Sequence, residues 1–115
     1  MGYMCHHAVI VSSCDKKLIE KARQKAVEIF GRYPDTKPLV SNMVTANVNN
    51  YRAFFIAPDG SKEGWSASDE GNECRKDFLD WVKAQAFEDG SNMLGWALVQ
   101  FDDDEEDNKL LEASK

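Results

Sequence analysis

The chain has 115 residues, of which 43% are apolar, 10% aromatic and 30% charged. These totals predict a single domain over residues 1–115, with a core of about 5–101 and an acidic C-terminal extension at 102–115. No apolar stretch reaches the roughly 18 to 20 residues that span a bilayer, and no secretion signal is recognisable. The three cysteines are widely spaced, so we expect no disulfides and a cytoplasmic location.

The net charge of −6 is divided unevenly along the chain. Residues 1–52 carry eight Lys/Arg against four Asp/Glu, a net charge of +4, whereas residues 53–115 carry six against sixteen, a net charge of −10. An acidic surface repels phosphate backbones, which argues against direct binding of nucleic acid. A basic surface on another protein is the better candidate partner.

The first half of the chain predicts a strand and a helix. The segment "CHHAVIVSS", residues 5–13, contains a continuous β-branched apolar run that is typical of a buried central strand. Asp15 or Ser13 can cap the following segment, where apolar residues recur at three- and four-residue steps until Gly31. The basic side chains between these apolar positions form its outward face.

A hairpin is predicted next. "LVSNMVTANV", residues 39–48, is a strand candidate, and "YRAFFIA", residues 51–57, is the most aromatic one in the chain. Asn49 and Asn50 between them suit a reversal, because asparagine tolerates left-handed backbone geometry.

The second half predicts a long loop, a helix and a strand. Residues 58–71 begin with a Pro-Asp-Gly turn and form a loop longer than most connections, which favours a functional role. A helix is expected from about Asn72 to Phe87, and "MLGWALVQF", residues 93–101, as the last strand. "DNKLLEASK" is expected to be a short tail.

The resulting order is β-α-β-β-α-β in the α+β class. It predicts a ferredoxin-like four-stranded antiparallel sheet with two helices on one face, and with the first and third strands at the centre. The opposite face of the sheet would stay uncovered and receive apolar side chains. We therefore expect an association surface there, with a homodimer as the simplest outcome.

No assembled catalytic set is recognisable. Cys5, His6 and His7 could ligate a metal by type, but adjacent strand residues point to opposite faces, so no metal site is predicted. Cys14 near a helix start could be reactive, yet no base is placed beside it. Phosphate-binding glycine loops are absent, and "YRAFFIA" lacks the detailed pattern of an RNA-binding strand. We expect neither enzymatic activity nor a cofactor.

Six consecutive carboxylates follow the last predicted strand. One interpretation is a solvated extension. The other is a row of charges about 3.3 Å apart in an extended chain, a spacing close to the axial rise of about 3.4 Å per phosphate on one DNA strand. In the second interpretation the protein is a DNA mimic that occupies a basic groove. The candidate partner-binding residues are Asp102, Asp103, Asp104, Glu105, Glu106 and Asp107, with Asp69, Glu70, Glu73 and Trp65.

A competing hypothesis is a small-molecule-binding protein or enzyme of the same fold. Its pocket would lie between the sheet and the loop 58–71, with Trp65, Tyr51 and Arg52 as walls. Stabilisation by a small ligand would favour it.

Four segments together suggest a family: "HHAVIVSSCDKKLIEKARQKAVEIFG", "NNYRAFFIAPDGSKEGW", "FLDWVKAQAFEDGS" and "GWALVQFDDDEED". Their order and texture resemble small phage- and prophage-encoded proteins, and distantly the type II-C anti-CRISPR inhibitors of Cas9. The resemblance implies a non-enzymatic host-takeover or anti-defence protein that binds a bacterial nuclease in the host cytoplasm. The long acidic loop departs from those inhibitors, and no site residue carries over from them.

Overall fold

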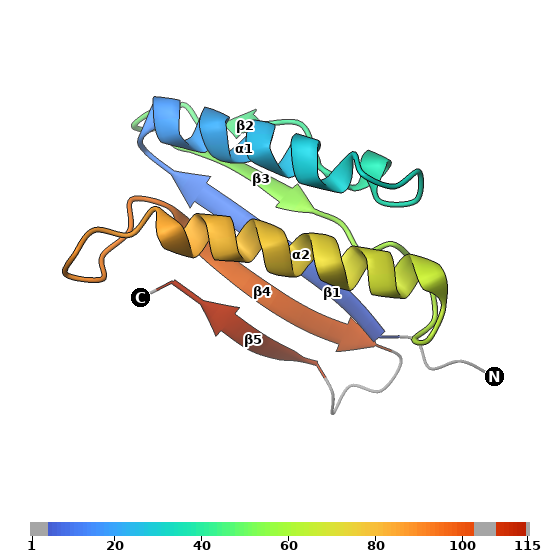
Figure 1. Ribbon diagram of the computed structural model, residues 1–115. Helices are drawn as coiled ribbons and strands as arrows, with labels where there is room; N and C mark the ends of the chain where they lie inside the picture. Colours follow the sequence, from blue (N-terminus) through green and yellow to red (C-terminus); the bar gives the residue numbers. More distant parts are fainter. Residues whose placement is uncertain (1–4, 103–107, 115) are drawn as a thin grey trace.

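The structure, a computed structural model, describes residues 5–102 and 108–114 (Figure 1). Two long helices and five strands make up this part of the chain. In chain order the elements are β1 (Cys5–Ser13), α1 (Lys16–Phe30), the 3₁₀ turn η1 (Lys37–Leu39), β2 (Val44–Thr45), β3 (Arg52–Ile56), α2 (Ser66–Ala84), β4 (Gly95–Asp102) and β5 (Lys109–Ala113). None of the described helices is long and apolar enough to cross a membrane.

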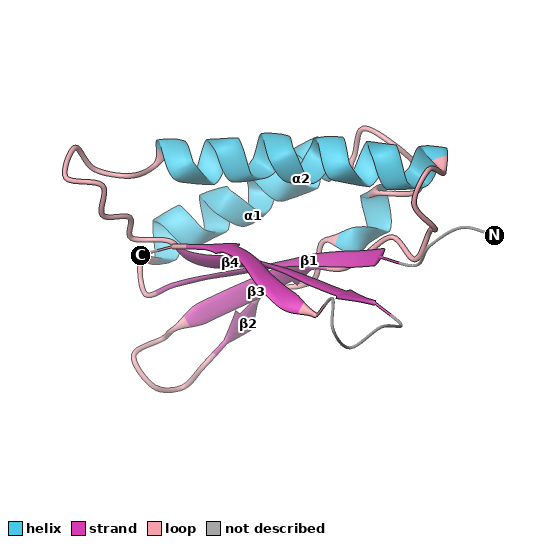
Figure 2. Ribbon diagram, turned by 90° about the horizontal axis from the view of Figure 1, so that it is seen from below, coloured by secondary structure: helices cyan, strands magenta, loops and turns pink. Residues whose placement is uncertain are grey.

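The strands form one sheet in the order β2-β3-β1-β4-β5, and every neighbouring pair is antiparallel. Both helices cover the same face (Figure 2). The α+β class is therefore confirmed, with two helices and an antiparallel sheet. The predicted number of four strands is wrong, because residues 109–113, expected to be tail, pair with β4 as a fifth strand.

Strand alternation explains why β1 can lie inside the sheet. Val9 and Val11 are fully buried beneath the helices, whereas Ile10 between them is 48% exposed on the opposite face. Antiparallel partners follow the same alternation, so Phe54 and Ile56 of β3 also point into the core. The predicted central position of this strand is confirmed.

The helix α1 begins and ends where the sequence indicates. The side chain of Asp15 accepts a hydrogen bond from the backbone N–H of Leu18 at 3.1 Å, and the helix stops at Phe30, before Gly31. Its apolar stripe, including Ile19 and Ala26, is buried against the sheet and α2.

The helix α2 begins six residues earlier than predicted, at Ser66, and ends at Ala84 instead of about Phe87. Its first turns bury small residues such as Ser68 and Gly71, which carry no apolar periodicity. The loop expected at 58–71 is correspondingly shorter.

The second strand is also shorter than the predicted 39–48. It comprises Val44–Thr45, while Val40 makes only an isolated bridge to Ile56. The reversal after it is confirmed, because Asn49 and Asn50 have φ values of 55° and 51°.

Candidate functional site

The end of β4 and the start of α2 lie at the same end of the molecule (Figure 1). Asp102 is the last residue of β4 and pairs with Cys5 at the start of β1. At this end His7 and Gln100 approach each other, with Nε2 and Oε1 3.2 Å apart. The other five acidic-run residues, Asp103, Asp104, Glu105, Glu106 and Asp107, lie outside the described residues.

Three predicted partner-binding residues project from the start of α2. Trp65 is 55% exposed and directly precedes the helix, and the ammonium group of Lys62 lies 5.9 Å from the centre of its ring. Asp69 is exposed and Glu70 is partly exposed. Neither carboxylate takes part in an ion pair with any described residue, so their charges face solvent uncompensated. We call Trp65, Asp69 and Glu70 the acidic end.

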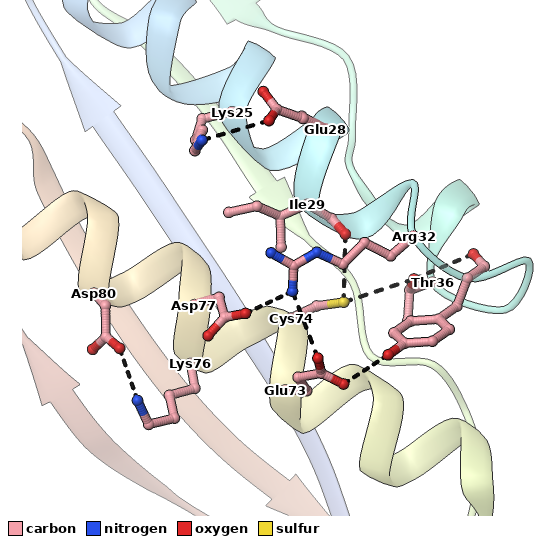
Figure 3. A network of polar contacts seen from close by, with 11 residues as sticks. Lys25, Glu28, Ile29, Arg32, Thr36, Glu73, Cys74, Lys76, Asp77 and Asp80 are labelled. Carbon is pink, nitrogen blue, oxygen red and sulfur yellow. Dashed lines mark hydrogen bonds and ion pairs between the residues drawn. The ribbon is translucent and has the colours of Figure 1, made fainter.

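Glu73 is placed differently. Its carboxylate accepts a hydrogen bond from the hydroxyl of Tyr33 at 2.8 Å and lies 3.7 Å from the guanidinium of Arg32 (Figure 3). The hydrogen bond to this carboxylate raises the pKa of Tyr33, because the bond is lost when the phenol ionises. Glu73 thus helps to join α1 to α2, and its charge is partly neutralised within the chain.

The two histidines occupy opposite faces of the sheet, as predicted. His6 packs on Phe101 with ring centres 5.4 Å apart, whereas His7 contacts Gln100 on the helix-covered face. Between residues 5 and 102, and in 108–114, no three His, Cys, Asp or Glu side chains gather as a metal site would require.

Cys14 is far from both histidines, so neither can act as its base, whereas Sγ of Cys5 lies 4.0 Å from Nε2 of His7. Cys14 is exposed at the end of β1 opposite to His7, about 23 Å away along an extended strand. Cys74 is buried, and its thiol lies 3.6 Å from the carbonyl of Ile29; burial raises its pKa. No disulfide links the three cysteines, all of which are described.

The walls of the predicted small-molecule pocket do not come together. Arg52 pairs with Ser13 at one end of the sheet, and the hydroxyl of Tyr51 lies 2.9 Å from that of Ser12. Trp65 precedes α2 at the other end (Figure 1). These residues therefore line no common pocket.

The uncovered face of the sheet is apolar. Strand alternation and register direct Ile10, Phe55, Phe101 and Leu110 to this face, where they are 40–61% exposed. Among the described residues of β1, β3, β4 and β5, the side chains on this face include no Asp, Glu, Lys or Arg. They are His6, Ala8, Ile10, Ser12, Ala53, Phe55, Ala97, Val99, Phe101, Leu110 and Ala113.

Sequence reasoning missed Arg75. This side chain is only 6% exposed, and it lines a cavity together with His7, near the start of β1, and Leu98 of β4. Its spacing from Gly71, Phe78 and Leu79 places it on the buried stripe of α2, which is the signal that could have identified it.

Comparisons with protein-family models, with curated proteins and with solved structures found no match for this chain. Function has to be inferred from its own residues.

Proposed function

We propose that this chain is a non-enzymatic acidic protein that binds a basic surface of a bacterial nucleic-acid-processing protein and inhibits it. The observation that carries the proposal is the pair Asp69 and Glu70. Both are unpaired among the described residues and lie at the end of the molecule where β4 leads into the acidic run. A surface of this kind competes with phosphates for a basic groove.

Trp65 supports binding by contact. An exposed tryptophan beside carboxylates suits an interface anchor, because aromatic residues that become buried on binding dominate many interfaces. The carboxylates would mainly accelerate association, since exposed charges steer encounter more than they hold a complex together.

The same proposal includes a finer description of the fold. The first four strands lie in the order β2-β3-β1-β4, which suits a ferredoxin-like unit, and β5 would be an addition to its edge. A small phage- or prophage-encoded anti-defence protein is the class that the sequence resembles, and a compact domain with one acidic end suits that role.

The test is affinity capture from bacterial lysate, followed by binding measurements with the purified partner. The variant neutralises Asp102, Asp103, Asp104, Glu105, Glu106 and Asp107 to Asn or Gln. The matched control neutralises six exposed carboxylates elsewhere: Glu20, Glu28, Asp35, Asp80, Glu88 and Asp89. We expect only the first variant to lose a nucleic-acid-processing partner, DNA to compete with wild type, and binding to weaken steeply with salt. An unchanged set of partners would contradict the proposal.

A second copy of the chain is the proposed occupant of the uncovered sheet face. The five strands are two to nine residues long, so at about 3.3 Å per residue and about 4.8 Å between strands they give a face of roughly 450 Å², smaller than the roughly 800 Å² per partner of a standard interface. Because this face lacks charge, two chains of net charge −6 can meet there without opposing like charges.

Sedimentation velocity tests this assembly. We expect a dimer that dissociates in Ile10→Lys and Phe55→Lys, whereas Val27→Lys, at an exposed site on α1, remains dimeric. A wild-type monomer at high micromolar concentration would exclude a homodimer and leave the face to a different partner.

A further inference from the structure

A cavity of about 260 Å³ lies between α2 and the strands β4 and β5. Its apolar part is formed by Leu79, Leu98 and Leu111, and its polar part includes His7 and Arg75. The volume is slightly below the range of about 300 to 1,000 Å³ typical of ligand pockets, so a ligand would be small.

Arg75 is the unusual group in this cavity. Its Nη2 donates a hydrogen bond to Oδ1 of Asn72 at 2.6 Å, but its buried Nη1 has no hydrogen-bond partner among the described residues. Arginine keeps its charge in proteins, and a buried donor without an acceptor is costly. The guanidinium therefore has an unused capacity to bind an anion.

The other charges around the cavity are already compensated. Lys76 pairs with Asp80 at 2.8 Å, and Lys83 pairs with Glu112. Burial and the nearby Arg75 lower the pKa of His7, which favours its neutral form at neutral pH. Of the three Lys and Arg side chains that line the cavity, Arg75 alone has no ion pair among the described residues.

Asp59 lies near Arg75 but does not form an ion pair with it. Its Oδ1 accepts hydrogen bonds from the backbone N–H and the hydroxyl of Ser61, at 2.8 and 2.5 Å. A Cβ on Gly71 would lie 2.6 Å from Oδ2 of Asp59 and 3.2 Å from both terminal nitrogens of Arg75, yet these two side chains form no ion pair. Asp59 contributes attraction at a distance and leaves Nη1 without an acceptor.

We propose that this cavity binds a small monoanion with a short apolar chain, a short-chain carboxylate, with its carboxylate on Arg75 and its chain against Leu79, Leu98 and Leu111. One positive charge without an ion pair favours a monoanion, and the leucines favour an alkyl chain over a fully polar anion. This site is separate from the acidic end and does not depend on the function proposed above.

The experiment is calorimetric titration of the full chain with hexanoate, acetate, inorganic phosphate and hexylamine. We expect saturable binding of hexanoate, weaker binding of acetate, and none of hexylamine or phosphate. Arg75→Met, which keeps the length of the side chain without its charge, should reduce hexanoate affinity at least about tenfold. Equal binding of hexanoate and hexylamine, or no binding of hexanoate, would overturn the proposal.

A second variant covers the case in which Arg75→Met does not fold. Leu111 is 42% exposed and lines the cavity, so Leu111→Glu places a competing carboxylate at the site with little risk to the core. The matched control is Val27→Glu, at an exposed apolar site on α1 that does not line the cavity. Loss of hexanoate binding in the first alone supports the site, and unchanged binding in both contradicts it.

Discussion

Nη1 of Arg32 lies 2.6 Å from Oδ2 of Asp77, which joins the residues after α1 to the middle of α2 (Figure 3). The hydrogen bond to this carboxylate raises the pKa of Arg32. Both side chains are about 40% exposed, so solvent screens the pair. We expect Arg32→Ala and Asp77→Ala each to lower the melting temperature only slightly, with a coupling energy that shrinks at high salt. A double-mutant cycle measures it, and a salt-independent coupling would contradict this description.

Phe78 is the central aromatic side chain of the core. It is fully buried between Phe54 and Trp81, with ring centres 6.3 and 6.4 Å away. Phe78→Ala should lower the free energy of unfolding by about 3 to 5 kcal/mol, because it removes buried apolar surface and leaves a cavity. The control Phe87→Ala, at a residue 59% exposed, should change it by less than about 0.5 kcal/mol. Urea denaturation gives both values, and similar values would contradict the assigned core.

Gly71 is required by close packing. A Cβ at this position would lie 2.6 Å from Oδ2 of Asp59 and 3.2 Å from both terminal nitrogens of Arg75. We expect Gly71→Ala to destabilise the wild type, although alanine is favoured over glycine in helices by about 1 kcal/mol. In an Asp59→Ala background the main clash is absent, so the same substitution should cost less or become stabilising. Thermal unfolding of the four proteins tests this, and an equal effect in both backgrounds would contradict it.

His7 should make stability depend on pH. Burial first and the charge of Arg75 second lower its pKa below the ordinary value of about 6.5, against the opposing hydrogen bond with Gln100. Between the two pKa values the unfolded chain binds the proton more readily than the folded one. The contribution of neutral His7 to the free energy of unfolding is therefore fully present above about pH 6.5 and decreases as the pH falls toward the folded-state pKa.

The measurement is urea denaturation between about pH 5 and 8, with an NMR titration of the His7 ring. We expect a midpoint below about 6.5 and a weaker pH dependence in His7→Gln than in the control His6→Gln. A midpoint above that value would reverse the sign and exclude burial as the dominant cause.

Local chemistry in the sequence determined several elements. Asp15 before the apolar periodicity and Gly31 after it mark the ends of α1, because capping and helix termination depend on a few neighbouring residues. Asn49 and Asn50 predict the reversal for the same reason, since the left-handed geometry is a property of the residues themselves. The continuous apolar run around Val9 predicts a buried strand at a central position in the sheet.

Tertiary structure alone decided the rest. Residues 109–113 have no clear alternation, and they become β5 because β4 offers an edge of unpaired backbone groups. The first turns of α2 bury Ser68 and Gly71, whose partners come from the distant loop around Asp59, so no apolar pattern predicts them. The spacing of Arg75 along α2 indicates that it is buried, but the sequence does not show that its charge is without an ion pair. That outcome depends on packing of α2 against the start of β1 and against β4, which removes water from one nitrogen while no acceptor among the described residues replaces it.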